Sequence, residues 1–261
     1  MEWSFASAGP IEANVEVASG RIDVKPRTEN EIEVSLEPMR ASSRRAAELI
    51  EAAKVVFENG ALRVRVPART FNNAEVLCTI ALPEGSSVSV RTASADVRCL
   101  SRIGDFAGTT ASGDVTLDEV DGELVLNTAS GDLRCRSVAS RLKVKGASSD
   151  ITIGTVGGPI DLVLASGDVD IDAAGASVKM HSASGDVDVG RVAEGEIKIR
   201  TASGDIAIGV APGVGAYLDV ASVSGEMTCT LPFQEASAGD AKLLITCQTM
   251  SGDVRIKAAS A

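Results

Sequence analysis

The sequence predicts an all-β protein, a right-handed parallel β-solenoid of about 18 residues per coil with one short N-terminal helix. The first observation behind this prediction is a Ser-Gly-Asp triplet, complete or degenerate, that recurs every 18 residues, beginning at Ser94, Ser112, Ser130, Ser148, Ser166 and Ser184. The second is a composition of 44% hydrophobic but only 3% aromatic residues, which suits a thin core of stacked aliphatic side chains. A fixed period indicates that each coil buries its apolar face against neighbouring coils.

Each coil is expected to hold two short strands. Val115 and Leu117 alternate with polar residues, and Leu124 and Leu126 repeat that alternation nine residues later. Alternation of period 2 is typical of a strand with one buried face. Hexapeptide helices and nonapeptide calcium repeats are disfavoured, because their inward spacing or glycine pattern differs. We therefore expect parallel pairing between strands one coil apart.

The repeats divide the chain into three regions of one continuous domain. Residues 1–93 are predicted to form an irregular N-terminal part of the solenoid with a helix at 43–54. Residues 94–211 carry the regular repeats. Residues 212–261 are expected to form irregular C-terminal coils with a protruding loop at 232–241.

The helix prediction depends on one apolar face, formed by Ala46, Leu49, Ile50 and Ala53. Ser42 or Ser43 is expected to cap its N-terminus. A lone amphipathic helix on a solenoid caps an open end or covers an exposed strand edge, and docking to a partner or a membrane surface is the alternative.

Charge and composition limit the partners. A net charge of −11 and the shortage of aromatic residues argue against nucleic acids, which need basic surfaces and stacking platforms. The N-terminus lacks the pattern of a signal peptide, and no apolar run is long enough to span a bilayer. The sequence therefore predicts a cytoplasmic protein without membrane insertion.

The five cysteines are predicted to pack in the core as free thiols. Cys99 and Cys135 occupy inward positions two coils apart, roughly 9–10 Å, which is too far for a disulfide. Cys78, Cys229 and Cys247 alternate with apolar residues and are also expected to point inward. None has metal-ligand spacing.

Four motifs resemble those of a known family. They are Ala-Ser-Gly-Asp-Val-Asp-Val at 183–189, Gly-Pro-Ile-Glu at 9–12, the helical segment 46–53 before a strand, and Val-Arg-Val-Pro at 64–67. With these, the whole chain resembles the bacterial putative-adhesin β-strand-repeat family, a domain of unknown function with Ser-Gly-Asp-Val repeats. The resemblance implies a β-helix-like fold, a role in surface attachment or scaffolding, and no catalytic residues.

The triplet aspartates are expected to stack at one corner of the solenoid, at Asp96, Asp114, Asp132, Asp150, Asp168, Asp186 and Asp205. We expect each carboxylate or serine hydroxyl to accept backbone N–H bonds of its turn, which offsets the repulsion of like charges.

A second acidic group suggests a cation site. Asp168, Asp170 and Asp172 point outward from one strand, with Asp186 and Asp188 beside them on the next coil. Five carboxylates in one patch suit a hard cation such as Ca²⁺. The alternative is a solvated acidic face, and no other cofactor is expected.

The second strand of the coils carries basic residues outward, at Lys143, Lys145, Lys179, His181, Lys198 and Arg200. Opposite charges on two faces favour association between molecules, whereas lysines on exposed strands also serve simply to prevent aggregation.

These features predict a non-enzymatic scaffold or adhesin-like β-solenoid that binds a protein partner or itself. The regular coils carry almost no loop insertions to build a cleft, and no nucleophile–base pair or phosphate loop is present. The alternative is a calcium-dependent carbohydrate-binding or polysaccharide-cleaving β-helix, which depends on the five-aspartate patch.

Overall fold

The computed structural model describes residues 1–27, 31–68, 74–231 and 242–259. It divides into two compact units, residues 1–134 and 135–261, which are described separately. Both are built from β-strands, and the described residues include one short helix, as predicted. The predicted loop 232–241 lies outside the described residues. The hand of the solenoid and the single continuous domain stay predictions.

The first unit contains two sheets. One has the order β1 (Glu2–Ala6), β4 (Glu31–Pro38), β7 (Val76–Pro83), β3 (Ser19–Arg27), β9 (Ser94–Ile103) and β11 (Val115–Val120). The other has the order β12 (Leu124–Thr128), β10 (Phe106–Thr110), β8 (Ser87–Arg91), β2 (Glu12–Glu16), β6 (Ala61–Arg65) and β5 (Lys54–Glu58). Regular strands pair in parallel with partners 18 residues away, as Phe106 does with Leu124. Alternate side chains of these strands are buried and form the core.

Part of the first unit departs from the predicted parallel pairing. Strand β1 pairs antiparallel with β4, β4 with β7, and β5 with β6. The turn between β5 and β6 contains Asn59 and Gly60, with φ angles of 52° and 76°. Two successive positive φ angles match the twist of a tight β-hairpin, and Asn-Gly is the dipeptide that favours them. The predicted parallel pairing therefore does not hold for these strands of the irregular N-terminal part.

The helix α1 (Arg44–Glu51) begins as predicted and ends earlier. The Ser43 hydroxyl accepts the Ala46 N–H at 3.3 Å, so Ser43 is the N-cap. The predicted end at residue 54 was wrong, because Lys54 already begins β5, whose Val55, Val56 and Phe57 pair with β6.

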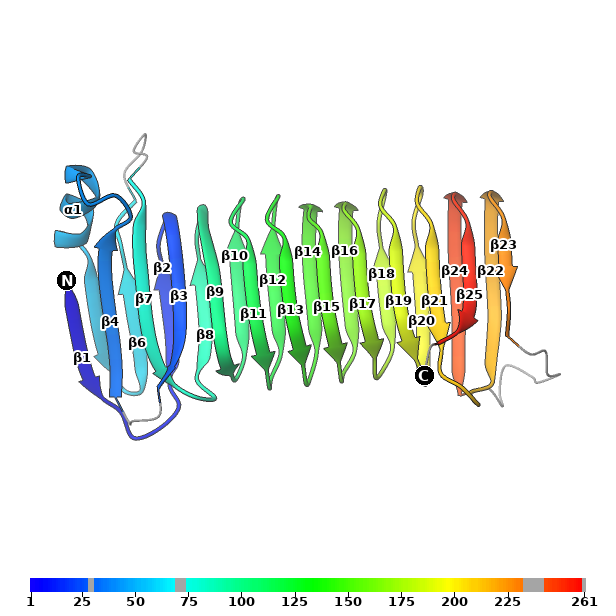
Figure 1. The fold of residues 1–261 in the computed structure, drawn as a ribbon, viewed down its shortest axis with the longest axis horizontal. Helices are drawn as coiled ribbons and strands as arrows, with labels where there is room; N and C mark the ends of the chain where they lie inside the picture. Colours follow the sequence, from blue (N-terminus) through cyan, green and yellow to red (C-terminus); the bar gives the residue numbers. More distant parts are fainter. Residues whose placement is uncertain (28–30, 69–73, 232–241, 260–261) are drawn as a thin grey trace. The chain divides into compact units, whose positions relative to one another are not determined.

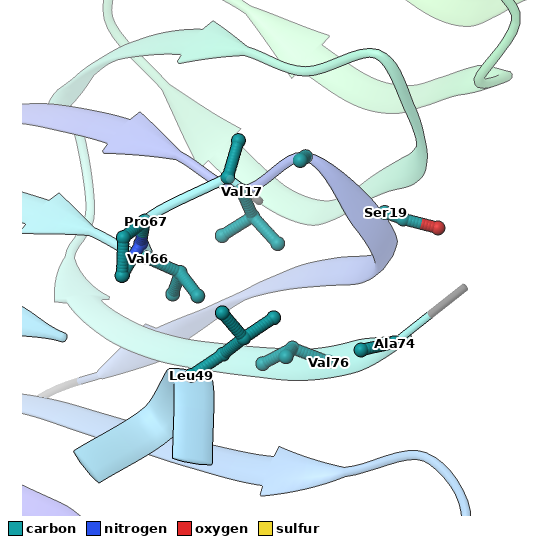
Figure 2. A pocket seen from close by; sticks show the side chains of 9 residues that line it. Val17, Ser19, Leu49, Val66, Pro67, Ala74 and Val76 are labelled. Carbon is teal, nitrogen blue, oxygen red and sulfur yellow. The ribbon is translucent and has the colours of Figure 1, made fainter. Parts of the chain in front are cut away.

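The helix is fixed to the first unit by its apolar face. Ala46, Leu49 and Ile50 are buried. Figure 2 shows Leu49 pointing towards Val17, Val66 and Val76 around a small cavity of about 30 Å³. This volume is enough for only one or two water molecules, so the helix closes the space between the two sheets.

The second unit also contains two sheets, whose described strands pair in parallel. One has the order β15 (Ile151–Val156), β17 (Val169–Ala174), β19 (Val187–Val192), β21 (Ile206–Val210), β25 (Val254–Ala258) and β23 (Met227–Cys229). The other has the order β14 (Leu142–Ser148), β16 (Ile160–Ser166), β18 (Val178–His181), β20 (Gly195–Arg200), β24 (Leu243–Ser251) and β22 (Ala216–Ser224). Strand β13 (Leu133–Val138) spans the boundary between the units.

The last coils of the second unit are not in sequence order. Strands β24 and β25 come last in the chain, yet they pair with β20 and β21 on one side and with β22 and β23 on the other. Figure 1 shows β24 and β25 inserted before β22 and β23 in this way. Among the residues that the structure describes, the coil formed by β22 and β23 is therefore the outermost coil of this unit.

Candidate functional site

The triplet aspartates form a repeated backbone contact. In the first unit, the Asp114 N–H donates to Asp96 Oδ1 at 3.2 Å, and the Asp132 N–H donates to Asp114 Oδ1 at 3.1 Å. In the second unit, the Asp186 and Asp205 N–H groups donate to the preceding aspartate's Oδ1, both at 2.8 Å. Each carboxylate thus binds the next coil rather than its own turn, which gives these residues a structural role.

The five predicted metal-binding aspartates fall into two groups. Asp168 and Asp186 belong to the corner, where Asp168 Oδ1 already accepts the Asp186 N–H. Asp170 lies opposite Asp188 in the register of β17 and β19. Desolvation raises the pKa of Asp170, and the charges of Asp188 and Asp172 add to that rise.

The outward patch therefore consists of Asp170, Asp172 and Asp188. Across residues 1–27, 31–68, 74–231 and 242–259, no group of three or more His, Cys, Asp or Glu side chains has the arrangement of a metal site. Calcium binding by the five aspartates stays a prediction.

The basic residues point outward from β14, β18 and β20 as predicted, but they do not form an uninterrupted basic row. Asp161 of β16 stands in register between Lys143 and Lys179. Val163 stands between Lys145 and His181, and His181 lies beside Arg200. The outward position of Asp161 follows from the same alternation as that of the basic residues. This carboxylate reduces the positive charge of this face.

Four cysteines confirm the core prediction, and one contradicts it. All five are free thiols, and Cys78, Cys99, Cys135 and Cys247 are buried. Burial raises the pKa of Cys78 and of Cys247 to about 12, so both stay protonated and unreactive at neutral pH. Cys229 is exposed, because the inner side of its strand is not covered by a further coil among the described residues.

The first unit contains one broad hollow on a sheet surface. It measures about 400 Å³ and is floored by the small side chains of Ser35, Thr79 and Ala81, with Glu33 and Lys25 at its rim. The neighbouring Arg27 donates to Glu31 at 2.6 Å, and Ser4 donates to the same carboxylate at 2.5 Å. These bonds lower the pKa of Glu31 and tie β1, β3 and β4 together. The charges beside this hollow thus stabilise the fold.

The most unusual surface is the open edge, which we define as β22, β23 and the inner residues Leu218, Val220, Met227 and Cys229. Met227 is 56% exposed, although its position in the repeat is an inward one. A hollow of about 240 Å³ lies between these residues and Val254 and Ile256. In the described residues, β22 pairs only with β24, and β23 only with β25.

The open edge keeps the stacking pattern of the interior coils. Val220 lies opposite Cys247, and Met227 lies opposite Val254. The Glu226 N–H donates to Asp253 Oδ1 at 2.9 Å, as the triplet aspartates do. The outer coil is therefore a normal coil with one face stacked and the other exposed. The sequence signal for it was the triplet at 224–226, which precedes the region that breaks the spacing.

In the described part of the chain, no helix is long and apolar enough to cross a lipid bilayer. The predicted cytoplasmic location stays a prediction.

A solved structure shares this fold. A protein from Parabacteroides distasonis, described as a putative lipid binding protein, is 15% identical with a TM-score of 0.59, covering 98% of this chain and 96% of that chain. A putative adhesin from Bacteroides fragilis is 11% identical with a TM-score of 0.46, with coverage of 98% and 96%. At such identities the first likeness shows the fold alone, and the second carries no argument.

The search of curated proteins found no match. The model of the Toastrack DUF4097 family, by contrast, matches residues 11–260, almost the whole chain. These residues include both sheets of each unit and the open edge. The chain therefore belongs to the Toastrack DUF4097 family.

Proposed function

We propose that this protein is a non-enzymatic, adhesin-like scaffold that binds a protein through the open edge of its second unit. The observation that supports this proposal is the outer coil, whose inward-type side chains and strand edges are exposed. Unpaired strand edges are templates for pairing with another chain. Contiguous apolar surface on a soluble domain commonly marks an interaction site.

The chemistry of the described residues supports a non-enzymatic role. The Cys78 and Cys247 thiols are protonated, and His181 has Val163 and Arg200 as its register neighbours rather than a nucleophile. The solved structure that shares the fold is described as a putative lipid binding protein, not as an enzyme. The absence of nucleic-acid partners and of membrane insertion is part of the same proposal.

A calcium-dependent carbohydrate-binding or polysaccharide-cleaving β-helix is the second candidate. Desolvation, and then repulsion from Asp188 and Asp172, raise the pKa of Asp170; a divalent cation would relieve that repulsion, which supports this candidate. Calcium should then raise the melting temperature of the parent protein but not that of a variant with Asp170→Asn and Asp188→Asn. An equal shift in both proteins would exclude the patch.

A photo-crosslinking amino acid tests the scaffold function in the cells that produce the protein. We would place it at Val223, which is 84% exposed on β22, and at Leu100, which is 65% exposed on β9, as a control. The proposal predicts one discrete protein adduct from position 223 and none from position 100. No adduct at 223, or equal adducts at both positions, would contradict it.

A further inference from the structure

The shape of the open edge indicates what binds there. Resting on the proposed function, we propose that the partner is a second copy of this chain, joined edge to edge about a two-fold axis. In this dimer β22 pairs antiparallel with β22 of the other copy, and β23 with its β23.

A second copy matches both parts of the open edge. Strands β22 and β23 belong to different sheets, and the hollow lined by Leu218, Val220 and Met227 lies between them. One extended peptide would pair with one strand and leave the other strand and part of the apolar layer exposed. Another two-sheet coil supplies two strands and an apolar layer together, which continues the coil-to-coil interface already present between β22–β23 and β24–β25.

The edge of the first unit is a poorer match to the open edge, which disfavours head-to-tail joining. Its outer strands β1 and β5 are paired antiparallel to β4 and β6. The rings of Phe5 and Phe57 meet with their centroids 5.8 Å apart and so close the space between the two sheets. Lys54 and Glu58 are exposed on β5. In the described residues the inward positions of β1 and β5 are half-buried, whereas Met227 and Cys229 are exposed, so a symmetric contact between two open edges is favoured.

The charges on the open edge allow a symmetric contact. Antiparallel pairing centred on Val220 places Asp219 opposite Ala221 of the other copy. Pairing centred on Thr228 places Met227 opposite Cys229 of the other copy. No like charges stand directly opposite each other, and apolar side chains meet in the middle.

Light scattering across a concentration series tests this inference on the purified chain. We expect the mass to rise from one chain to two and then to stop, since a two-fold contact is closed. Val220→Lys should keep the protein monomeric over the same range. The control Val56→Lys makes the same change on β5, and should dimerise like the parent.

A second variant guards against a folding defect at Val220, which is half-buried. Val223 is 84% exposed, so Val223→Lys leaves the core intact and should weaken the dimer at least tenfold in dissociation constant. A parent that stays monomeric at every concentration, a mass that grows past two chains, or a dimer unchanged by both β22 variants would overturn the inference. A monomer that still gives a foreign adduct at position 223 would overturn only the second copy as partner and leave the scaffold function standing.

Discussion

The two units end their sheets in different ways. The first unit ends on β1 and β5, which also pair on one side only, but they run antiparallel to their neighbours and their Phe5 and Phe57 rings pack together. The second unit ends on β22 and β23, which pair in parallel and carry inward-type residues that remain exposed. A repeat therefore does not terminate itself, because every coil presents the surface on which a further coil can stack. Termination needs sequence that departs from the repeat, and in the described residues the antiparallel strands of the first unit are such a departure.

The largest expected contrast comes from removing one leucine side chain from each edge. Leu49→Ala should lower the free energy of unfolding by about 2–5 kcal/mol, because it enlarges the cavity beneath α1. Leu218→Ala should cost about 1 kcal/mol, since that side chain is only half-buried. Urea unfolding of both variants measures the difference. Equal losses would show that the two edges are equally covered.

The turns of the two edges provide the next contrast. Gly60 has a φ angle of 76°, so Gly60→Ala should cost about 1–2 kcal/mol through backbone strain. Gly215, just before β22, lacks a left-handed φ and has open space around its Cα. Gly215→Ala should therefore be neutral or stabilise slightly. Thermal melts of both variants measure the difference. A destabilised Gly215→Ala variant would show that the backbone at Gly215 does not tolerate a side chain.

The helix cap gives a smaller effect. Ser43→Ala removes the acceptor of the Ala46 N–H and should cost about 1 kcal/mol. Ser42→Ala is the matched control, because no hydrogen bond of the Ser42 side chain stabilises the helix. Chemical denaturation should show a lower free energy of unfolding for Ser43→Ala than for Ser42→Ala. The reverse order would show that Ser42, and not Ser43, is the N-cap.

The smallest effects should be opposite in sign and dependent on pH. Hydrogen bonds from Ser4 and Arg27 lower the pKa of Glu31, so this carboxylate stabilises the fold above its unfolded pKa and loses that effect as pH falls. Desolvation and two carboxylates raise the pKa of Asp170, so its charge destabilises the fold once pH exceeds the raised value. At pH 7, Glu31→Gln should lower the melting temperature and Asp170→Asn should raise it slightly.

Both differences should shrink as pH falls below about 4, where both carboxyl groups are protonated in the unfolded chain. Melts at several pH values would measure this convergence. Asp161→Asn is the control for Asp170→Asn, since Asp161 lies between Lys143 and Lys179 and its loss should not stabilise. A rise in melting temperature for Asp161→Asn would show that the Asp170 effect is not caused by like charges.

Alternation and spacing predicted most of the fold. The repeat of Val115 and Leu117 in later coils was sufficient for parallel strands with partners 18 residues away, and the spacing of Ala46, Leu49 and Ile50 for the helix. The antiparallel pairing of β5 with β6 was also signalled, by Asn59–Gly60, but the repeat suggested parallel pairing instead. Strand period alone does not fix the direction of pairing.

The candidate site could not be predicted to the same extent. The inward position of Cys229 follows from alternation, but its exposure depends on which coil lies outermost. The coil of β22 and β23 lies outermost because β24 and β25 lie between it and the coil of β20 and β21. This order is set by long-range strand pairing and has no local sequence signal. Sequence order placed residues 243–258 last, and the structure places the earlier strands there instead.

Amide hydrogen exchange, measured strand by strand at low and high protein concentration, tests most directly whether the two edges differ. We expect the amides of β22 and β23 to exchange fastest among the strands at low concentration and to exchange more slowly as the concentration rises. The amides of α1, and those of β6, which lies between β2 and β5, should exchange slowly at both concentrations. Slow, concentration-independent exchange in β22 and β23 would contradict the account, because it would show that the open edge is already covered within a single chain.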